Sequence, residues 1–272
     1  MLVSVIIPVH NQLAYTRQCL NSLFVTENGI RQEVIVIDNA SSDGTASYLQ
    51  EKGRRLKTIR NSTNDGFARA CNLGARAAAG RYLCFLNNDT ICQSGWLSSL
   101  LALIESEPRI GVVGSKLLYP DGTVQHAGVV ISGENPIVPV LIYQGAPAKA
   151  PYVNKTRDFQ AVSGASMLVR RQVFEAAGGF DEGYINGCED LDFCFEVRRL
   201  GYRIVYTPAS VLCHFESSTP GRHRYILENR ARLQAKWLGK ITADAAQYYR
   251  QDGFDQVPHF FNASRKMRQI KG

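Results

Sequence analysis

The residues of this chain most able to do chemistry are carboxylates that follow short apolar runs. Residues 82–86 form such a run, typical of a buried parallel strand, and they lead into Asn87, Asn88 and Asp89. Ligands of open α/β sheets bind beyond the carboxyl ends of the strands, so Asp89 stands where a metal ion or a phosphate would be met. The alternative is that residues 88–90 form only a turn that caps the next helix.

Other carboxylates occupy similar places. Asp38 ends a second apolar run and Asp43 follows it in a polar loop, while Glu189, Asp190 and Asp192 open a predicted helix. A helix N-terminus stabilises ionised carboxylates, so these three side chains suit a charged role, although capping and compensation of the helix dipole would explain them equally. A histidine completes the candidates: His214 ends a predicted strand, where a structural role is the alternative.

Several common chemistries are excluded by their missing motifs. The chain has no Gly-Lys-Ser/Thr phosphate loop, no Gly-x-Gly-x-x-Gly after the first strand and no Gly-x-Ser-x-Gly nucleophile elbow. Seven cysteines include no Cys-x-x-Cys pair, which argues against a structural zinc site and favours reduced thiols in a cytoplasmic protein.

The elements that position these residues alternate between strand and helix. Strands are expected at residues 2–8, 33–37, 56–60, 82–86 and 110–114, and helices at 15–24, 45–52, 67–79 and 95–107. Short loops between them predict an α/β fold with a mainly parallel sheet. Residues 117–160 hold five of the ten prolines and have no clean period, so we expect strand fragments and loops that shape a cleft.

The second half continues the pattern less regularly. We expect strands at 159–169, 203–206 and 210–214, helices at 170–177 and 189–200, a basic and aromatic helix at 222–238, and a weakly patterned stretch from 241 to 272.

The order of the motifs is more specific than any one of them. Along the chain stand Val5-Ile6-Ile7-Pro8-Val9-His10-Asn11, Val36-Ile37-Asp38-Asn39-Ala40-Ser41-Ser42-Asp43-Gly44, Gly66-Phe67-Ala68-Arg69-Ala70-Cys71-Asn72, Leu86-Asn87-Asn88-Asp89-Thr90, Gly178-Gly179-Phe180-Asp181-Glu182, Glu189-Asp190-Leu191-Asp192 and His214. Over about residues 3–215 this series resembles the family 2 glycosyltransferases, above all their rhamnosyltransferase-like branch. The resemblance implies a GT-A-type, Rossmann-like mixed sheet that is mostly parallel, has flanking helices, and carries a C-terminal helical extension. The catalytic domain would be residues 1–218, with a nucleotide-binding half at about 1–115 and an acceptor half at about 116–218, and the extension would be 219–272.

The resemblance also assigns roles. Asp38 would lie near the ribose or base, Asp43 near the base edge, and Arg69 near a phosphate. The full set implied for the nucleotide is Pro8, His10, Asn11, Asp38, Asp43, Asn64, Gly66, Phe67, Arg69, Asn72 and Asn88. The set implied for the sugar or acceptor pocket is Ser163, Gly164 and Ala165, with Asp192 as a brace.

Asp89 and His214 match the family's metal ligands, which implies a Mn²⁺ or Mg²⁺ cofactor, and Asp190 matches its general base, with Glu189 beside it. One departure is plain: the family motif often has two carboxylates, whereas here Asn87 and Asn88 precede the single charge of Asp89. Asparagine oxygens suit these ions but add no charge, so we expect weak metal binding without nucleotide.

The implied activity is an inverting transfer of a sugar from a nucleoside diphosphate, most of all a dTDP- or UDP-sugar, to a hydroxyl of a glycan or lipid-linked acceptor in cell-surface polysaccharide assembly. An inactive sugar-nucleotide-binding module of the same fold is the alternative. A nucleotidyltransferase would need a Gly-rich basic signature near the first strand, which Val9-His10-Asn11-Gln12 lacks.

Charge adds little to this choice. A net charge of +7 favours anionic partners, but the basic residues are dispersed and no recognition motif accompanies them, so we expect no nucleic-acid partner. The basic helix at 222–238 (Arg222, His223, Arg224, Tyr225, Arg230, Arg232, Lys236 and Trp237) is either a packed helix with a solvated face or a peripheral contact with the inner face of a membrane.

Overall fold

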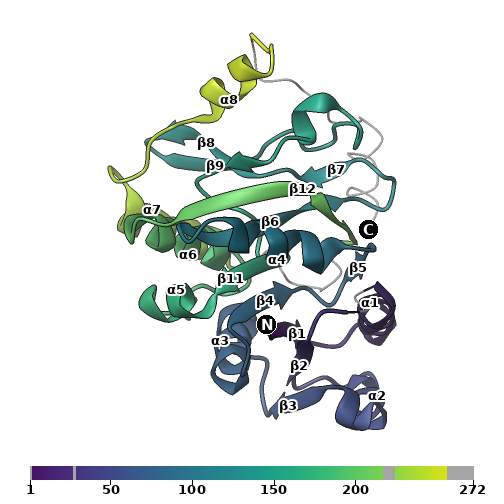
Figure 1. Ribbon diagram of the computed structural model, residues 1–272. Coiled ribbons are helices and arrows are strands. Elements are labelled where there is room, and N and C mark those ends of the chain that lie inside the picture. The colour runs from purple at the N-terminus through teal and green to yellow at the C-terminus, as the bar shows by residue number, and fades with distance from the viewer. Residues whose placement is uncertain (1, 27–28, 217–223, 256–272) are drawn as a thin grey trace, which may run out of the picture.

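A curled, mixed sheet organises the molecule in the computed structural model, which describes residues 2–26, 29–216 and 224–255 (Figure 1). The strands are β1 (Val3–Val9), β2 (Gln32–Asn39), β3 (Lys57–Asn61), β4 (Tyr82–Leu86), β5 (Thr90–Cys92), β6 (Ile110–Leu118), β7 (Val124–His126), β8 (Val129–Glu134), β9 (Ile137–Leu141), β10 (Arg157–Asp158), β11 (Ser166–Arg170) and β12 (Arg203–His214). The main sheet has the order β10-β12-β6-β11-β4-β1-β2-β3, with β5 beside β12 and β7 beside β6, while β8 and β9 form a separate hairpin.

Helices cover both faces of this sheet. They are α1 (Leu13–Thr26), α2 (Thr45–Glu51), α3 (Gly66–Ala77), α4 (Trp96–Ser106), α5 (Arg171–Ala176), α6 (Glu189–Arg199), α7 (Ile226–Trp237) and α8 (Ala245–Gln251), with short 3₁₀ turns at Gly53–Arg55 and Pro151–Val153. In β1, Val3, Val5 and Ile7 pack in one core with α1, α2 and α4, whereas Ile6 packs in the other with α3. Strands buried on both faces need apolar residues at every position, which explains their continuous apolar runs.

Strand direction brings the polar residues together. Neighbouring pairs β1–β2, β1–β4, β2–β3 and β6–β12 are parallel, and β11 runs antiparallel between β4 and β6. The carboxyl ends of β1, β4 and β12 therefore share an edge with the beginning of β11, where Ser166 pairs with Leu86. The predicted α/β fold is confirmed.

Two local predictions were wrong. The strand expected at 159–169 begins only at Ser166, because residues 163–165 form a turn at the sheet edge. The two strands expected around Pro208 are one strand, β12, whose register shifts between Thr207 and Val211 and so accommodates the proline. The stretch after residue 241, whose pattern is weak and which belongs to the expected helical extension, contains α8, whose Ala245 and Tyr249 are buried.

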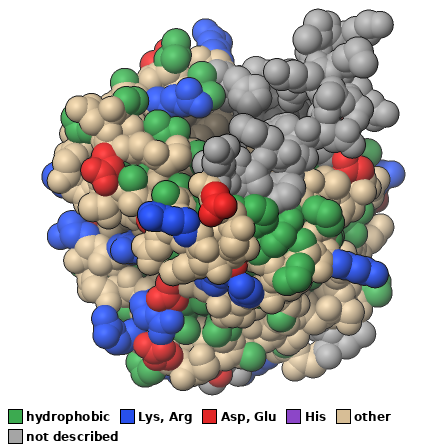
Figure 2. Space-filling view, turned by 90° about the horizontal axis from the view of Figure 1, so that it is seen from above, with side chains coloured by type: hydrophobic (Ala, Val, Ile, Leu, Met, Phe, Trp, Pro, Cys, Tyr) green, Lys and Arg blue, Asp and Glu red, His purple; other side chains and the backbone are tan. Residues whose placement is uncertain are grey.

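The C-terminal helices share a core with α6 and the second half of the chain. Leu233 and Trp237 of α7 pack in the same cluster as Phe193 and Phe195 of α6. On the face that Figure 2 shows, acidic and basic side chains are interspersed over the described surface. Among the described residues, none of the helices has the length and apolar character that crossing a bilayer requires.

Candidate active site

A cavity of about 360 Å³ opens at this shared edge of the sheet. Thirteen residues predicted for the site line it: Pro8, His10, Asn64, Gly66, Phe67, Asn88, Asp89, Ser163, Gly164, Ala165, Glu189, Asp190 and His214. These residues come from the ends of β1, β4 and β12, from the turn before β11 and from the starts of α3 and α6. The fold thus gathers residues that lie more than two hundred positions apart in the sequence.

The side chains of Asp89 and His214 lie next to each other in the wall of the cavity. The pairing of β5 with β12 sets Thr90 opposite His214, and Oδ1 of Asp89 lies 3.1 Å from Nε2 of His214. The imidazole is oriented from its other side, since its Nδ1–H donates to Oε1 of Gln125 over 2.6 Å. Gln125 in turn donates its side-chain amide to Glu216. In the neutral ring, Nε2 is then a lone-pair acceptor aimed at a carboxylate.

Two atoms that both present lone pairs repel each other at this distance unless a proton or a cation lies between them. The carboxylate oxygen of Asp89 and the ring nitrogen of His214 are therefore a pair of ligand atoms that fits a divalent ion. Two ligands at right angles on an octahedral Mg²⁺, each about 2.1 Å from it, are about 3 Å apart. A hydrogen bond that fixes the remote ring nitrogen is the usual support of a ligating histidine. Among the described residues no group of three His, Cys, Asp or Glu side chains forms a metal site. Oxygen atoms of a bound nucleoside diphosphate would therefore have to complete the coordination of the ion.

The two asparagines before Asp89 have different surroundings. Nδ2 of Asn87 lies 3.2 Å from Nε2 of His214, so this amide also contacts the candidate metal ligand. Nδ2 of Asn88 donates to the Thr16 hydroxyl, and its side chain also lines the cavity. Asn87 was not among the predicted site residues, although it directly precedes two that were.

Asp190 lies at the first turn of α6, held against the turn at 163–165. Its Oδ2 accepts the Gly164 N–H over 2.9 Å and its Oδ1 accepts the Leu191 N–H. A Cβ on Gly164 would lie 3.2 Å from Cβ of Asp190, so glycine permits this close approach. Glu189 also lines the cavity but is nearly buried, and its Oε2 accepts the Gly187 N–H.

A histidine that the sequence analysis did not select supports the same turn. His126 is buried in the cavity wall, donates Nδ1–H to the Ser115 carbonyl and accepts the Ser163 N–H at Nε2. Burial lowers the pKa of His126 to about 4, which keeps the ring neutral and able to both donate and accept. The ring therefore fixes the backbone that meets Asp190.

The loops after β1 and β2 are joined to each other. His10 donates Nδ1–H to the Asn39 carbonyl, and Asn11 accepts the Ser42 N–H while its own N–H donates to Ser41. Asn11 has a φ of 58°, a left-handed conformation that asparagine tolerates well. Asn11 itself lies outside the cavity lining, whereas His10 lies within it.

Asp38 and Asp43 also lie outside the lining and bind the protein's own backbone. Oδ1 of the buried Asp38 accepts the Ser41 N–H, and its Oδ2 lies 3.4 Å from the Arg60 guanidinium. Asp43 accepts the first N–H groups of two helices, those of Leu13 and Thr45.

Three further predicted residues lie outside the cavity lining, two of them against the loop before α6 and the third within α6. Arg69 pairs with Glu182 at 3.4 Å, and Asn72 makes two hydrogen bonds with the Phe180 backbone. Asp192 is buried against α7 rather than in the cavity lining.

Besides Asn87, the cavity lining includes residues that were not predicted for the site. The residues missed there are Val9, Asn39, Gln125, His126, Val129, Pro139, Val140, Leu141, Asn186, Leu191 and Glu216. Gln125 and His126 are polar residues in a short strand, which is the one signal that could have indicated them. The apolar members come largely from the β8–β9 hairpin.

Comparisons with known proteins agree with this architecture. A sequence model described as Glycosyl transferase family 2 matches residues 4–178. The chain is 33% identical over 260 residues to an uncharacterized protein of Sinorhizobium fredii, covering 90% of this chain and 28% of that protein. It is 32% identical over 227 residues to the O-antigen biosynthesis protein RfbC of Myxococcus xanthus, covering 80% of this chain and 17% of that protein.

The chain covers a larger share of a third relative. Over 209 residues the chain is 28% identical to an N-acetylglucosaminyl-diphospho-decaprenol L-rhamnosyltransferase of Mycobacterium tuberculosis, covering 70% of this chain and 68% of that protein. The chain therefore spans only 28% and 17% of the length of the first two relatives but about two thirds of this one.

Solved structures match nearly the whole chain. The crystal structure of GalNAc-T7 with UDP, GalNAc and Mn²⁺ has a TM-score of 0.70 at 18% identity, covering 99% of this chain and 53% of that one. The mannosyltransferase PcManGT from Pyrobaculum calidifontis, in complex with GDP-Man and Mn²⁺, has a TM-score of 0.62 at 20% identity, covering 92% and 67%. At such identities these likenesses establish the fold, which is of the predicted GT-A type.

Proposed function

The chain belongs to glycosyl transferase family 2, and we propose that it is an inverting enzyme that moves a sugar from a nucleoside diphosphate to an acceptor hydroxyl. The observation that carries the proposal is that Asp89 and Asp190 line one cavity, beside the ends of β1 and β4. A carboxylate for the metal and diphosphate and a carboxylate for the acceptor proton are the two charges that this reaction needs.

Asp190 is the proposed base. Its position at a helix start favours the ionised form, and the N–H groups of Gly164 and Leu191 hold the carboxylate in place. It takes the proton of the acceptor hydroxyl as that oxygen attacks the anomeric carbon. The bond from that carbon to the diphosphate breaks in the same displacement, the nucleoside diphosphate leaves, and the configuration inverts.

Asp89 and His214 would hold Mn²⁺ or Mg²⁺ together with the donor diphosphate. When bound, the ion supplies positive charge against the negative charge that grows on the leaving group. Gln125 keeps the imidazole in the orientation that this role requires. Both structural neighbours contain Mn²⁺, which supports a divalent cofactor.

The structural neighbours contain UDP and GDP-Man, respectively, and the M. tuberculosis relative is a rhamnosyltransferase. We propose a dTDP- or UDP-sugar donor and a glycan or lipid-linked acceptor in cell-surface polysaccharide assembly, which the names of the M. xanthus and M. tuberculosis relatives support. The apolar wall of the cavity suits an acceptor or sugar with an exposed hydrocarbon face.

A donor screen tests the proposal. Thermal shift with UDP-, dTDP- and GDP-sugars and Mn²⁺ should raise the melting temperature for one nucleotide class only. Proton NMR of the slow hydrolysis of that donor should then show first the sugar anomer opposite to that of the donor. Retained configuration would contradict the inverting mechanism, and binding without turnover of any donor would favour the inactive module.

A further inference from the structure

Residues 180–188 form the last part of the loop between α5 and α6, and this part of the loop supplies some of the cavity lining. Asn186 lines the cavity and accepts the Phe67 N–H at the start of α3, and Glu189 and Asp190 follow directly. A displacement of this loop would therefore move the proposed base. The loop contains no helix or strand of its own, so contacts with the rest of the protein must fix its position.

Two asparagines hold the loop from opposite sides through its backbone. Asn72 of α3 donates to the Phe180 carbonyl over 2.8 Å and accepts the Phe180 N–H over 3.0 Å. Asn229 of α7 makes the same pair of bonds with Ile185, donating over 2.8 Å and accepting over 3.1 Å. Asn229 is 4% exposed, so its two bonds are shielded from competition by water.

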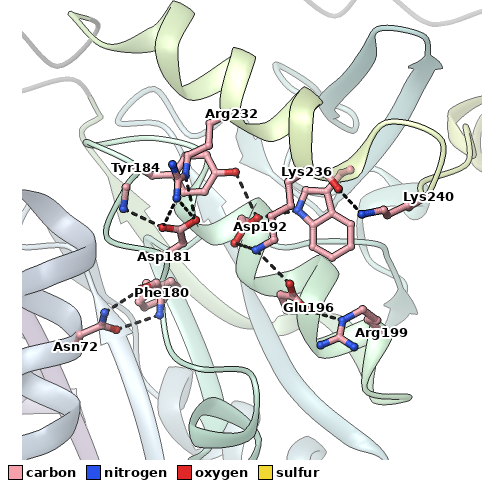
Figure 3. Close-up of polar contacts among 12 residues, drawn as sticks. Asn72, Phe180, Asp181, Tyr184, Asp192, Glu196, Arg199, Arg232, Lys236 and Lys240 are labelled. Carbon is pink, nitrogen blue, oxygen red and sulfur yellow. Dashed lines mark hydrogen bonds and ion pairs between the residues drawn. The ribbon is translucent and has the colours of Figure 1, made fainter.

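An arginine of α7 fastens the first part of the loop. Arg232 makes a forked contact with Asp181, with N–O distances of 2.9 to 3.0 Å (Figure 3). Its guanidinium lies 5.5 Å from the centroid of the Tyr184 ring. A Cβ on Gly183 would lie 2.4 Å from Cζ of Arg232, so glycine lets the guanidinium rest on the backbone.

The end of α7 is fastened to α6 itself. Asp192 accepts Trp237 Nε1–H over 2.7 Å and Lys236 over 2.9 Å, and Tyr184 donates its hydroxyl to the same carboxylate over 3.3 Å (Figure 3). Lys236 also pairs with Glu196. Two cations and the tryptophan of the basic helix thus face the protein. Arg222 and His223 of the expected membrane contact lie outside the described residues.

We infer that Asn229 and Arg232 are positioning residues of the transfer reaction, an inference that rests on the proposed function. They set the loop so that Asn186 and Asp190 face the bound substrates. Their loss should lower kcat more than it weakens nucleotide binding, because Asp190 follows the loop directly. A misplacement of about 1 Å can cost about a hundredfold in rate.

The test compares Asn229→Ala with Arg230→Ala, the exposed neighbour on the same helix. Using the donor that the parent hydrolyses, we expect Asn229→Ala to lower kcat at least tenfold with the Kd for its nucleoside diphosphate and Mn²⁺ unchanged. Amides of residues 181–188 should exchange faster, and those of the sheet should not. Arg230→Ala should match the parent in all three measurements.

Arg232→Gln, which changes a half-exposed side chain, is the second variant in case Asn229→Ala fails to fold. It should also lower kcat and speed exchange of the loop amides, but by less. A faster-exchanging loop with parental kcat would overturn the inference, as would a kcat loss matched by an equal loss of nucleotide affinity. If the parent hydrolyses no donor, the proposed function is contradicted, and amide hydrogen exchange alone then tests the positioning role. Unchanged exchange of the loop amides in Asn229→Ala would overturn that role.

Discussion

The ends of β1 and β2 and the ends of β4 and β12 present similar polar residues at one edge of the sheet, but their surroundings differ. After β2, Asp38 and Asp43 accept N–H groups of their own turns and helices and lie outside the cavity lining. After β4 and at the start of α6, Asp89 and Asp190 line the cavity. Place at a strand end therefore does not by itself make a carboxylate reactive.

Because of this difference, we expect substitutions in the two regions to cause two different defects. Changes at Asp89 and Asp190 should remove activity from a folded protein. Changes at Asp43 should loosen the fold and leave the chemical step nearly intact. Each substitution below tests one side of the comparison.

Asp190→Asn has the largest expected effect. The amide keeps the size of the side chain and can still accept the Gly164 N–H, but it cannot take a proton. A positioned base contributes about 10²–10⁴-fold to rate, so single-turnover consumption of the donor should slow by that factor. Nucleotide binding by titration calorimetry should stay parental.

The matched control is Glu189→Gln, which alters the adjacent carboxylate. Its side chain accepts the Gly187 N–H and lines the same cavity, but we expect a smaller loss of rate. Near-parental turnover by Asp190→Asn would move the base to Glu189 and break the assignment of this side of the cavity.

Asp89→Ala should have the next largest effect. It removes the only carboxylate of the Asn87-Asn88-Asp89 turn and leaves His214 as the one remaining proposed ligand. Nucleoside diphosphate should then bind equally with and without Mn²⁺, whereas the parent should bind more tightly with it. Calorimetry in the presence of Mn²⁺ and of EDTA measures this, and an Mn²⁺ effect equal to the parent's would exclude Asp89 from the metal site.

Much of the fold could be predicted because buried parallel strands have a strong signature. The apolar runs of β1, β2, β4 and β6 and the short polar loops after them were visible in the sequence, and the order of the strand-end motifs indicated the family. The positions of Asp89 and His214 at one edge follow from the common direction of β4 and β12, whereas Asp190 is placed by the packing of α6 against the turn at 163–165.

The rest depends on contacts that no local pattern encodes. The β8–β9 hairpin, which supplies the apolar wall, lies in a proline-rich stretch without a period. Asp192 was expected to brace the site, but its partners Lys236 and Trp237 are more than forty residues away in α7. The sequence also placed Asn72 with the nucleotide, whereas in the structure its amide pairs with the backbone of Phe180. Such pairings depend on how helices meet, which tertiary packing decides.

The smallest effect is expected at Asp43. Its carboxylate accepts the Thr45 N–H and hydroxyl and the Leu13 N–H, and so it satisfies the first donors of α2 and α1. Loss of one such cap costs about 0.5–2 kcal/mol. Asp43→Ala should therefore lower the free energy of unfolding in urea by about that amount at pH 7, with kcat near parental and a modest rise in the donor KM. Glu51→Ala, an exposed change in α2, is the control.

The pH dependence makes the Asp43 prediction specific. Burial would raise the pKa of Asp43, but hydrogen bonds from Thr45 and Leu13 outweigh burial and lower the pKa below its ordinary value of 3.8. The unfolded chain then binds the proton more readily, so this stabilisation is present above pH 3.8 and is lost as the pH falls through the lower, folded value. The difference in unfolding free energy between parent and Asp43→Ala should accordingly shrink as the pH falls below 3.8. A difference independent of pH, or a collapse of kcat at unchanged stability, would place Asp43 with the reactive carboxylates and remove the contrast between the two parts of the edge.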